Sequence, residues 1–454
     1  MITELRLENF KSWRHMEKMR MAPITGLFGT NSSGKTSILQ LLLMLKQTVD
    51  SPDRSQVLNL GDDKTPIALG AFRDVVFGHE KPGCLEWTLS WSLPEALKIT
   101  DRTHENRVQF QGESMSFHAK VTENGSGRIA VSELEYALES ARFRYQQKSE
   151  TPDEYELTVA AGVFSFDRPR GRPWLLPAPI KCYGFPDQVR YSFRNVGFLS
   201  DLELEFERLT GRIYYLGPLR EYPERQYLWA GGSPADMGRR GEKVIQALLA
   251  LRERGEKMRL RKGKGGSQLI EAYIAEWLKK LGLIHEFSVK PITKDSNRYE
   301  AHVRMTEESS EVLITDVGFG LSQVLPVIVI CYYVPEGSTI LLEQPEIHLH
   351  PSVQENLADI FIDAVKRRKV QLIIESHSEH FLRRLQRRIA EEELKQEDVA
   401  LYFTTMEGGE SKLTPLDVDE YGNIRNWPRD FFGDDFGEIA ETEKARLRRQ
   451  IGKK

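Results

Sequence analysis

Cysteine is scarce in this sequence, which has three among its 454 residues, at positions 84, 182 and 331. An odd number of widely spaced cysteines excludes a disulfide framework and is typical of a reducing compartment. Long apolar runs are also missing, since no segment approaches the ~20 residues that a membrane helix needs. The first residues, MITELRLENF, lack the apolar core of a signal peptide. We therefore expect a cytoplasmic protein without a membrane segment.

A pronounced charge excess is missing as well, because the formal net charge is −4 at pH 7. This balance gives no overall attraction to nucleic acid, so such a contact would need a local basic patch. Residues 252–264 are one candidate, because seven of these thirteen residues are Lys or Arg. A solvated loop is the more common explanation for such a run, and nucleic acid stays an open partner class.

The chain does have a complete phosphate-binding loop, GTNSSGKT, at residues 29–36. An apolar strand at 24–28 precedes it and a leucine-rich helix at 37–49 follows, so backbone N–H groups and the helix N-terminus can surround a phosphate. Lys35 is expected to reach the β- and γ-phosphates and Thr36 to ligate magnesium. The predicted cofactors are ATP and Mg²⁺. The predicted nucleotide-binding residues here are Gly29, Thr30, Asn31, Ser32, Ser33, Gly34, Lys35, Thr36 and Ser37.

Two segments in the C-terminal half place polar residues directly after apolar stretches. Residues 338–343 form an apolar strand that ends in Glu343, and residues 370–374 form another that leads to Glu375 and His377. An acid at the end of a buried strand is typical of a Walker B element, where it holds magnesium directly or through water. We therefore expect Thr36 and Glu343 to be the metal ligands.

A family resemblance appears when these segments are taken together. Residues 7–12 (LENFKS), followed by the phosphate-binding loop, resemble the start of ABC-type ATPase heads of the AAA family that are related to the SMC proteins and the overcoming-lysogenisation-defect (OLD) nucleases. Residues 316–323 (DVGFGLSQ), before an apolar helix at 324–333, resemble the signature motif of these heads in its OLD-like form. The segment after residue 413 is similar to a short C-terminal domain of unknown function on a subset of bacterial defence ATPases.

The resemblance implies roles that residue types alone do not assign. Lys11 and Ser12 are expected to lie beside the nucleotide. His377 is expected to be the switch histidine, which bonds the γ-phosphate or the attacking water. The residues expected to cap the γ-phosphate bound by a partner head are Gly320, Ser322 and Gln323.

Residues 347–351 (IHLHP) resemble the loop by which OLD-like heads meet across a dimer. Two histidines beside acids also allow a metal site. That alternative is less favoured, because the intervening Leu349 and the following Pro351 suit a fixed loop better than a ligand helix.

One residue departs from the general ABC pattern. Gln344 stands where those heads have a catalytic glutamate, and glutamine can orient a water molecule but cannot take its proton. Hydrolysis should therefore be slow unless Glu346, Glu375 or His377 substitutes. The predicted catalytic set is Lys35, Glu343, Gln344, Glu346 and His377.

The rest of the chain predicts elements around these motifs. Alternation of apolar and polar residues between 84 and 166 indicates an antiparallel sheet, and it predicts further strands at 191–194 and 202–207. Residues 244–251 and 269–278 instead have helical spacing. No long heptad run is present, which excludes the long coiled-coil arm of SMC proteins.

The predicted fold class is therefore α/β: a P-loop ABC-type ATPase head, with a mixed sheet and flanking helices, a β-rich arm, a helical insert and no long coiled coil. The expected domains are the N-terminal lobe of the head (1–80), the arm (81–215), the insert (216–300), the C-terminal lobe with signature, Walker B and switch histidine (301–405), and the C-terminal domain of unknown function (406–454).

The resemblance implies an ATPase that forms an ATP-linked homodimer or higher oligomer and acts as a sensor or regulator of a partner effector, a nuclease encoded nearby, in prokaryotic antiviral defence. The alternative is an ATP-dependent DNA-binding clamp or DNA-repair factor in which hydrolysis is of minor importance. A self-contained nuclease, as in full-length OLD proteins, is disfavoured because few residues follow the head.

Overall fold

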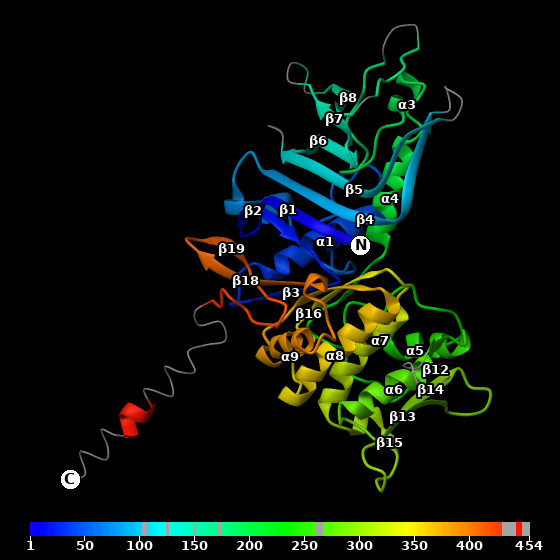
Figure 1. Ribbon diagram of the computed structural model, residues 1–454. Coiled ribbons are helices and arrows are strands. Elements are labelled where there is room, and N and C mark those ends of the chain that lie inside the picture. The colour runs from blue at the N-terminus through cyan, green and yellow to red at the C-terminus, as the bar shows by residue number, and fades with distance from the viewer. Residues whose placement is uncertain are drawn as a thin grey trace.

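The computed structural model describes residues 1–101, 107–123, 127–148, 151, 153–162, 164–169, 174–259, 267–428 and 442–446. Within these residues the chain has a mixed α/β fold with two large sheets. Figure 1 shows the antiparallel sheet and its arm above the parallel one, and a smaller lobe below. The longest helix in the described part of the chain has 18 residues, so this part contains no long coiled coil. The predicted fold class is confirmed.

The six-stranded sheet positions the candidate site. Its strands are, in spatial order, β19 (Glu410–Pro415), β18 (Val399–Glu407), β3 (Ile24–Gly29), β17 (Gln371–Glu375), β16 (Thr339–Glu343) and β9 (Ile213–Leu216). All neighbours are parallel except β18 and β19. Because the carboxyl ends of parallel strands share one edge, the phosphate-binding loop, Glu343 and Glu375 lie along the same edge.

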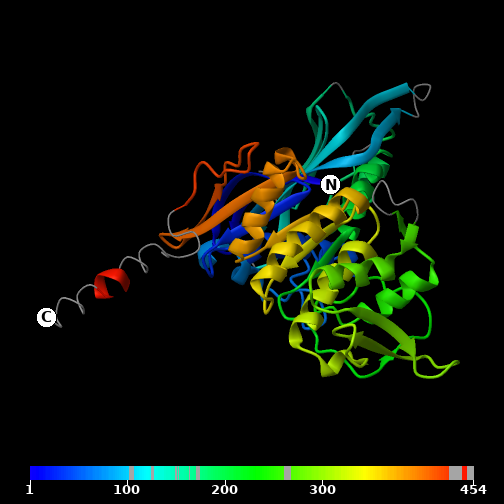
Figure 2. The same ribbon diagram turned by 60° about the horizontal axis from the view of Figure 1, so that its bottom comes forward.

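Helices cover both faces of this sheet. On one face lies α1 (Lys35–Asp50); on the other lie α7 (Phe319–Tyr333), α8 (Pro351–Arg368) and α9 (Glu379–Ala390), which Figures 1 and 2 show side by side in yellow and orange. Alternate residues along these strands point to opposite faces of the sheet and so belong to two separate hydrophobic cores. Leu27, Leu341 and Ile373 pack with α1, whereas Ile340, Leu342 and Ile374 pack with the other three helices.

The second sheet is antiparallel and has seven strands. In spatial order they are β2 (Trp13–Arg20), β1 (Ile2–Phe10), β4 (Cys84–Asp101), β5 (Arg107–Glu123), β6 (Ile129–Leu138), β7 (Ala141–Gln147) and β8 (Tyr155–Ala161). Thus β1 and β2, from the expected N-terminal lobe, share a sheet with the strands of the expected arm. The division into lobe and arm at residue 80 stays a prediction.

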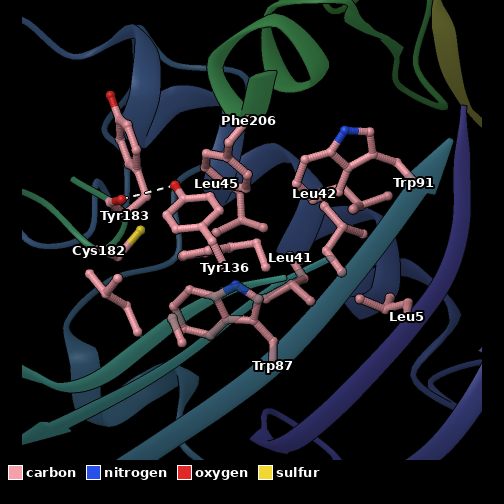
Figure 3. Close-up of a cluster of buried hydrophobic side chains, with 14 of the residues drawn as sticks. Leu5, Leu41, Leu42, Leu45, Trp87, Trp91, Tyr136, Cys182, Tyr183 and Phe206 are labelled. Atoms are coloured by element: carbon pink, nitrogen blue, oxygen red, sulfur yellow. Dashed lines mark hydrogen bonds between the residues drawn. The ribbon is translucent and has the colours of Figure 1, made fainter. Parts of the chain in front are cut away.

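The helix α1 is buried between the two sheets. Figure 3 shows Leu41, Leu42 and Leu45 of α1 among Trp87 and Trp91 of β4. Phe206 closes the same cluster from the side, and the hydroxyl of Tyr136 donates to the carbonyl of Tyr183 at 2.9 Å. The helix that follows the phosphate-binding loop is therefore held firmly in the core.

Two predicted strands are wrong. Residues 191–194 overlap α3 (Gln188–Ser192), and residues 202–207 lie in α4 (Leu199–Gly211). The segment LELEFE alternates, but its buried residues recur every three or four positions, which is the period of a helix. The buried residues of α4 are Leu199, Leu202, Phe206 and Thr210.

The insert contains the two expected helices, α5 (Val244–Glu253) and α6 (Ile270–Lys280). It also contains strands that the sequence analysis did not identify. These are β10 (Tyr227–Leu228) and β13 (Glu286–Pro291), and the ribbon of β11 (Lys257–Arg259) and β12 (Ser267–Leu269). The sheet of β10 and β13 extends past the expected boundary at residue 300 through β14 (Arg298–Arg304) and β15 (Val312–Leu313). Short helical turns elsewhere are α2 (Phe72–Val75), η1 (Phe77–His79), η2 (Ile314–Asp316) and η3 (Gln396–Asp398).

Part of the basic segment is neutralised inside the insert. The guanidinium of Arg252 donates to both carboxylate oxygens of Glu271, and Arg254 pairs with Glu256. Three of its seven cations, at positions 261, 262 and 264, lie outside the described residues.

In the part of the chain that the structure describes, no helix is long and apolar enough to cross a membrane.

Candidate nucleotide site

The phosphate-binding loop joins β3 to α1 through backbone conformations that favour glycine. Gly29 has φ 134° and Gly34 has φ 92°, both in the left-handed half of conformational space. A Cβ atom at Gly29 would lie 2.1 Å from the carbonyl oxygen of Thr404. The loop therefore needs glycine at this position for two reasons, its dihedral angle and its closeness to β18.

Lys35 lies inside this loop. Its ammonium donates to the carbonyl oxygens of Gly29 at 3.1 Å and Thr30 at 2.7 Å, and the side chain is buried. Burial lowers the pKa of Lys35, against the nearby carboxylates of Glu375 and Glu346. The cation is thus held by the loop that would surround a phosphate, at the position that the motif predicts.

The corner between β1 and β2 lies beside the loop. The indole of Trp13 donates to the carbonyl of Gly34 at 3.0 Å, and the hydroxyls of Ser12 and Ser411 are 2.6 Å apart. The ammonium of Lys11 donates to Gln40 of α1 at 2.5 Å. The structure therefore places Lys11 and Ser12 next to the loop and its helix.

Two acids lie at the ends of neighbouring strands. Glu343 and Glu375 are paired residues of β16 and β17, and the hydroxyl of Thr36 donates to Glu375 at 2.8 Å. Burial, and then the charge of Glu375, raises the pKa of Glu343 to about 7. Burial also raises the pKa of Glu375. Two buried carboxyls this close favour a cation between them.

These residues fit a magnesium ion. A hydroxyl and two carboxylates are the hard oxygen donors that Mg²⁺ prefers, and a phosphate and water would supply its other ligands. Magnesium bound there would neutralise phosphate charge. The structure joins Thr36 to Glu375 rather than to Glu343, so Glu375 joins the predicted pair as a candidate. Within the described residues, no group of three or more His, Cys, Asp or Glu side chains has the geometry to hold a metal by itself.

Glu343 has two further neighbours that the sequence analysis did not assign. The phenol of Tyr215, on β9, donates to its carboxylate at 3.0 Å. Arg220, four residues after β9, is 4% exposed and approaches the carbonyl oxygen of Glu343 at 3.5 Å. Its Nε and Nη1 atoms are buried without a hydrogen-bond partner, and burial lowers its pKa to about 10.

The segment after Glu343 turns sharply back into the site. Gln344 has φ 43°, and its N–H donates to the carbonyl of Glu375 at 2.8 Å. Glu346 is 7% exposed, and its Oε1 accepts from the hydroxyl of Ser376 at 2.8 Å and from the N–H of His377 at 2.6 Å. Its Oε2 is buried without a partner. The carboxylate of Glu346 therefore points toward the residues that follow β17, and burial raises the pKa of Glu346.

His377 lies two residues after the end of β17, at the sheet edge that holds Glu343 and Glu375, and it is exposed. Partial burial of the ring, and then the charge of Lys35, lowers the pKa of its imidazole. His377 comes two residues after Glu375, which accepts from Thr36 at the start of α1, so this residue follows the strand end that meets the phosphate-binding loop. An imidazole in its neutral form can donate one hydrogen bond and accept another.

The residues of the predicted signature motif lie at the start of α7, and their bonds differ from those of the groups above. The hydroxyl of Ser322 donates to the carbonyl of Phe319 at 2.7 Å, and the Nε2 of Gln323 is buried without a partner. A Cβ atom at Gly318 would meet nothing within 4 Å, and one at Gly320 would meet only Leu349, at 4.0 Å. Among the described residues, no hydrogen bond joins this turn to the phosphate-binding loop.

The two histidines of the segment 347–351, predicted to lie at a dimer contact, have different surroundings. His348 has φ 62° and is exposed, with its ring 5.4 Å from that of Phe319. His350 caps α8 through Ser352, whose N–H donates to its ring. The two side chains thus have different neighbours.

A glycine-rich loop with a buried lysine, set beside acids on two adjacent strands, defines the nucleotide site of a P-loop ATPase. The family comparison agrees. The model of the AAA ATPase domain matches residues 1–82 and 251–382, and that of a protein family of unknown function, DUF3696, matches residues 394–441. The chain therefore has an AAA ATPase domain in two segments, followed by a DUF3696 segment, and the predicted family is confirmed at this level.

Among solved structures, the chain is similar to heads of SMC proteins. An SMC head bound to the C-terminal winged-helix domain of ScpA is 12% identical, with TM-score 0.43, over 92% of this chain and 98% of that one. The SMC head domain from Thermotoga maritima is 11% identical, with TM-score 0.42, over 92% and 99%. An SMC head from Pyrococcus furiosus with the C-terminal domain of ScpA is 11% identical, with TM-score 0.42, over 92% and 96%. No curated protein matches the sequence.

Proposed function

We propose that this protein binds ATP with magnesium, hydrolyses it slowly and associates head to tail around two nucleotides. The observation that supports this most is the meeting of Lys35 and Thr36, at the start of α1, with Glu375, at the end of β17, at one sheet edge; the two segments are more than 300 residues apart in the sequence, since Thr36 and Glu375 are separated by 339 positions. Lys35 would leave the carbonyls of its own loop for the β- and γ-phosphates. The space around Gly318 and Gly320, at the start of α7, suits a phosphate brought by a second copy, and the buried Ser322 supports this turn through its bond to Phe319.

For the hydrolytic step we propose Glu346 as the group that accepts the proton of the attacking water. Gln344 has no basic group, whereas Glu346 has a buried carboxylate oxygen without a partner. The bonds from Ser376 and His377 fix its other oxygen. Glu346 lies two residues after the position of the usual base, and a base held at another position would transfer the proton less efficiently, which is consistent with slow turnover.

The biological role that we propose is that of a sensor or regulator of an effector nuclease in prokaryotic antiviral defence. This part rests on the sequence resemblance. The second candidate, an ATP-dependent DNA clamp in which hydrolysis is of minor importance, is favoured by Gln344. Phage plating with the protein and a nuclease encoded beside it, each alone and together, separates the two, since a clamp would protect without the nuclease.

Nucleotide binding is tested by the rise in melting temperature with ATP and magnesium. We expect a clear rise for the native protein and none for Lys35→Ala, because the lysine supplies the charge that the phosphates need. Lys46→Ala, a lysine of the same helix at its far end, is the matched control. An equal rise in Lys35→Ala would overturn the assignment of the site.

Association is tested separately by light scattering. ATP with magnesium should enlarge the native particle, and Ser322→Arg should abolish this because the buried site of Ser322 has no room for arginine, so the side chain would displace the first turn of α7. Ser322→Arg should still show the ATP-induced rise in melting temperature. If it associates as the native protein does, the first turn of α7 is not the contact with a second copy.

A further inference from the structure

The DUF3696 match, which names a family without a known function, begins inside the ATPase sheet. Its residues 394–441 include β18 and β19. The strand β18 pairs in parallel with β3 from Val399 opposite Ile24 to Thr404 opposite Gly29. The first part of this family segment is thus continuous with the strand that leads into the phosphate-binding loop.

Two hydroxyls of this hairpin contact the loop region directly. The hydroxyls of Thr404 and Ser33 are 2.6 Å apart, and Thr404 is also 3.0 Å from the carbonyl oxygen of Phe28, to which it can donate. On β19, the hydroxyl of Ser411 donates to that of Ser12, and its N–H donates to the carbonyl of Ser12 at 2.8 Å. Thr404, Ser411 and Ser33 are each at most 1% exposed.

The hairpin also limits the space of the loop. A Cβ atom at Gly34 would lie 2.3 Å from the hydroxyl of Ser411 and 2.8 Å from that of Ser12. At Gly29 the closest atoms of Thr404 are its carbonyl oxygen at 2.1 Å and its hydroxyl at 2.6 Å. Both glycines of the motif therefore lie directly against groups that the hairpin positions, so the two cannot move independently.

We propose that the hairpin β18–β19 is a wall of the ATP site, with Thr404 and Ser411 as positioning residues that hold the phosphate-binding loop in its nucleotide-accepting shape. This inference rests on the proposed binding of ATP. It gives the start of the DUF3696 segment a role: a change in the position of this segment would alter the affinity for ATP through the loop.

The hydroxyl of Thr404 is central because of the number of protons available. Thr404 and Ser33 have one hydroxyl proton each, and their acceptors are each other, the carbonyl of Phe28 and the carbonyl of Thr30, which lies 2.8 Å from the Ser33 hydroxyl. In either arrangement, one hydroxyl donates to the other and the second donates to a carbonyl of the loop region. The side chain of valine has the shape of threonine but neither donates nor accepts a hydrogen bond. Thr404→Val therefore removes these hydrogen bonds of Thr404 without removing side-chain volume.

The test compares three substitutions in the full chain. Thr404→Val should weaken ATP binding roughly three- to tenfold, the effect of losing one buried hydrogen bond, and Thr404→Ser, which keeps the hydroxyl, should restore most of it. Thr405→Val is the matched control. The hydroxyl of this neighbouring residue points away from the loop and donates to Glu407, at 3.4 Å, instead of to a group of the loop. The probe is ATP with magnesium, measured by calorimetry and by the KM and kcat of phosphate release.

If Thr404 is a positioning residue, KM for ATP should rise in Thr404→Val by a larger factor than kcat falls, and Thr404→Ser should restore KM. If Thr404→Val lowers the melting temperature but leaves the ATP affinity equal to that of Thr405→Val, the hairpin is only a structural support and the inference is overturned. If the native protein itself binds no ATP, the proposed function fails first, and the inference fails with it. Ser411→Ala should change the affinity in the same direction by a smaller factor, because its backbone bond to Ser12 remains.

Discussion

The two halves of the nucleotide site differ in how completely their polar groups are bonded. Around the phosphate-binding loop, Lys35, Ser33 and Thr36 all have hydrogen-bond partners inside the chain. In the half formed after β9 and β16, Arg220 and Glu346 each have buried polar atoms without one. Gln323, in the first turn of α7, shares this property.

This difference indicates which half is complete in a single chain. Buried polar atoms are nearly always bonded, because leaving one unpaired costs about 1–3 kcal/mol. The loop half is therefore preformed, and its lysine is held ready by its own carbonyls. The acid half has buried polar atoms of Arg220 and Glu346 that water, a nucleotide or a second copy could bond. Substitutions in the two halves should consequently change different properties, with binding affected by the loop and turnover by the acids.

Glu346 should show the largest effect on turnover. A general base contributes on the order of 10²–10⁴-fold in rate, so Glu346→Gln should lower kcat by about that factor and leave the ATP affinity near its native value. Phosphate release and calorimetry measure the two quantities.

Gln344→Glu is the companion variant. If it raises turnover strongly while Glu346→Gln changes little, the base is absent from the native chain, and the protein is a slowed clamp whose ATP-bound state is the working one. Such a result would contradict the division into a binding half and a catalytic half.

Arg220 should have the next largest effect. Replacing it with methionine removes the buried cation that faces Glu343 and Glu346, and leaves their charges less compensated. We expect kcat to fall roughly ten- to a hundredfold, and Arg220→Lys to restore part of it because the charge remains without the planar fork. Arg225→Met is the control, since this arginine is exposed and pairs with Asp316. Equal kcat in Arg220→Met and Arg225→Met would remove Arg220 from the site.

The same contrast explains what the sequence predicts well. The strand β3, the loop and α1 are consecutive, so their pattern is visible in about twenty-five adjacent residues and the phosphate site follows from spacing. The ends of β16 and β17 are predictable for the same reason, because an apolar run followed by Glu343 or Glu375 marks a strand edge. Local pattern is sufficient where the chemistry is local.

The remaining contacts depend on tertiary pairing. Thr404 lies 371 residues after Ser33, and nothing in its own neighbourhood marks it as part of the site. Arg220 had a weak signal, an arginine just after a buried strand, but only the sheet order places β9 next to β16. In α4 the local alternation of LELEFE was misleading, because packing against α1 favours the helical period. The nucleotide-contact, signature and switch roles stay predictions that the variants above address.

Glu203 offers the smallest and sharpest comparison, because it shares a raised pKa with Glu343 but lies outside the site. Burial raises the pKa of Glu203 to about 7, with smaller contributions from Glu207 and Asp187, and its Oε1 accepts from the N–H of Phe185 at 2.5 Å. It lines a cavity of about 310 Å³ with Lys181, whose ammonium donates to the carbonyls of Val49 and Ser51 at the end of α1. A raised pKa of this size can therefore arise mainly from burial, without a second acid paired on a neighbouring strand.

Because the folded-state pKa of Glu203 lies above its unfolded value of about 4.5, the folded protein holds this proton more tightly. Its stabilising contribution is complete below about pH 4.5 and is lost as the pH rises through about 7. Glu203→Gln keeps an oxygen for the N–H of Phe185 and cannot ionise. Its melting temperature should therefore equal the native value near pH 5 and exceed it by a few degrees at pH 8, with ATP hydrolysis unchanged at both. A loss of turnover in Glu203→Gln would mean that this cavity, at the far end of α1, is coupled to the nucleotide site. Glu203 could then no longer be treated as independent of Glu343 and the other acids of that site.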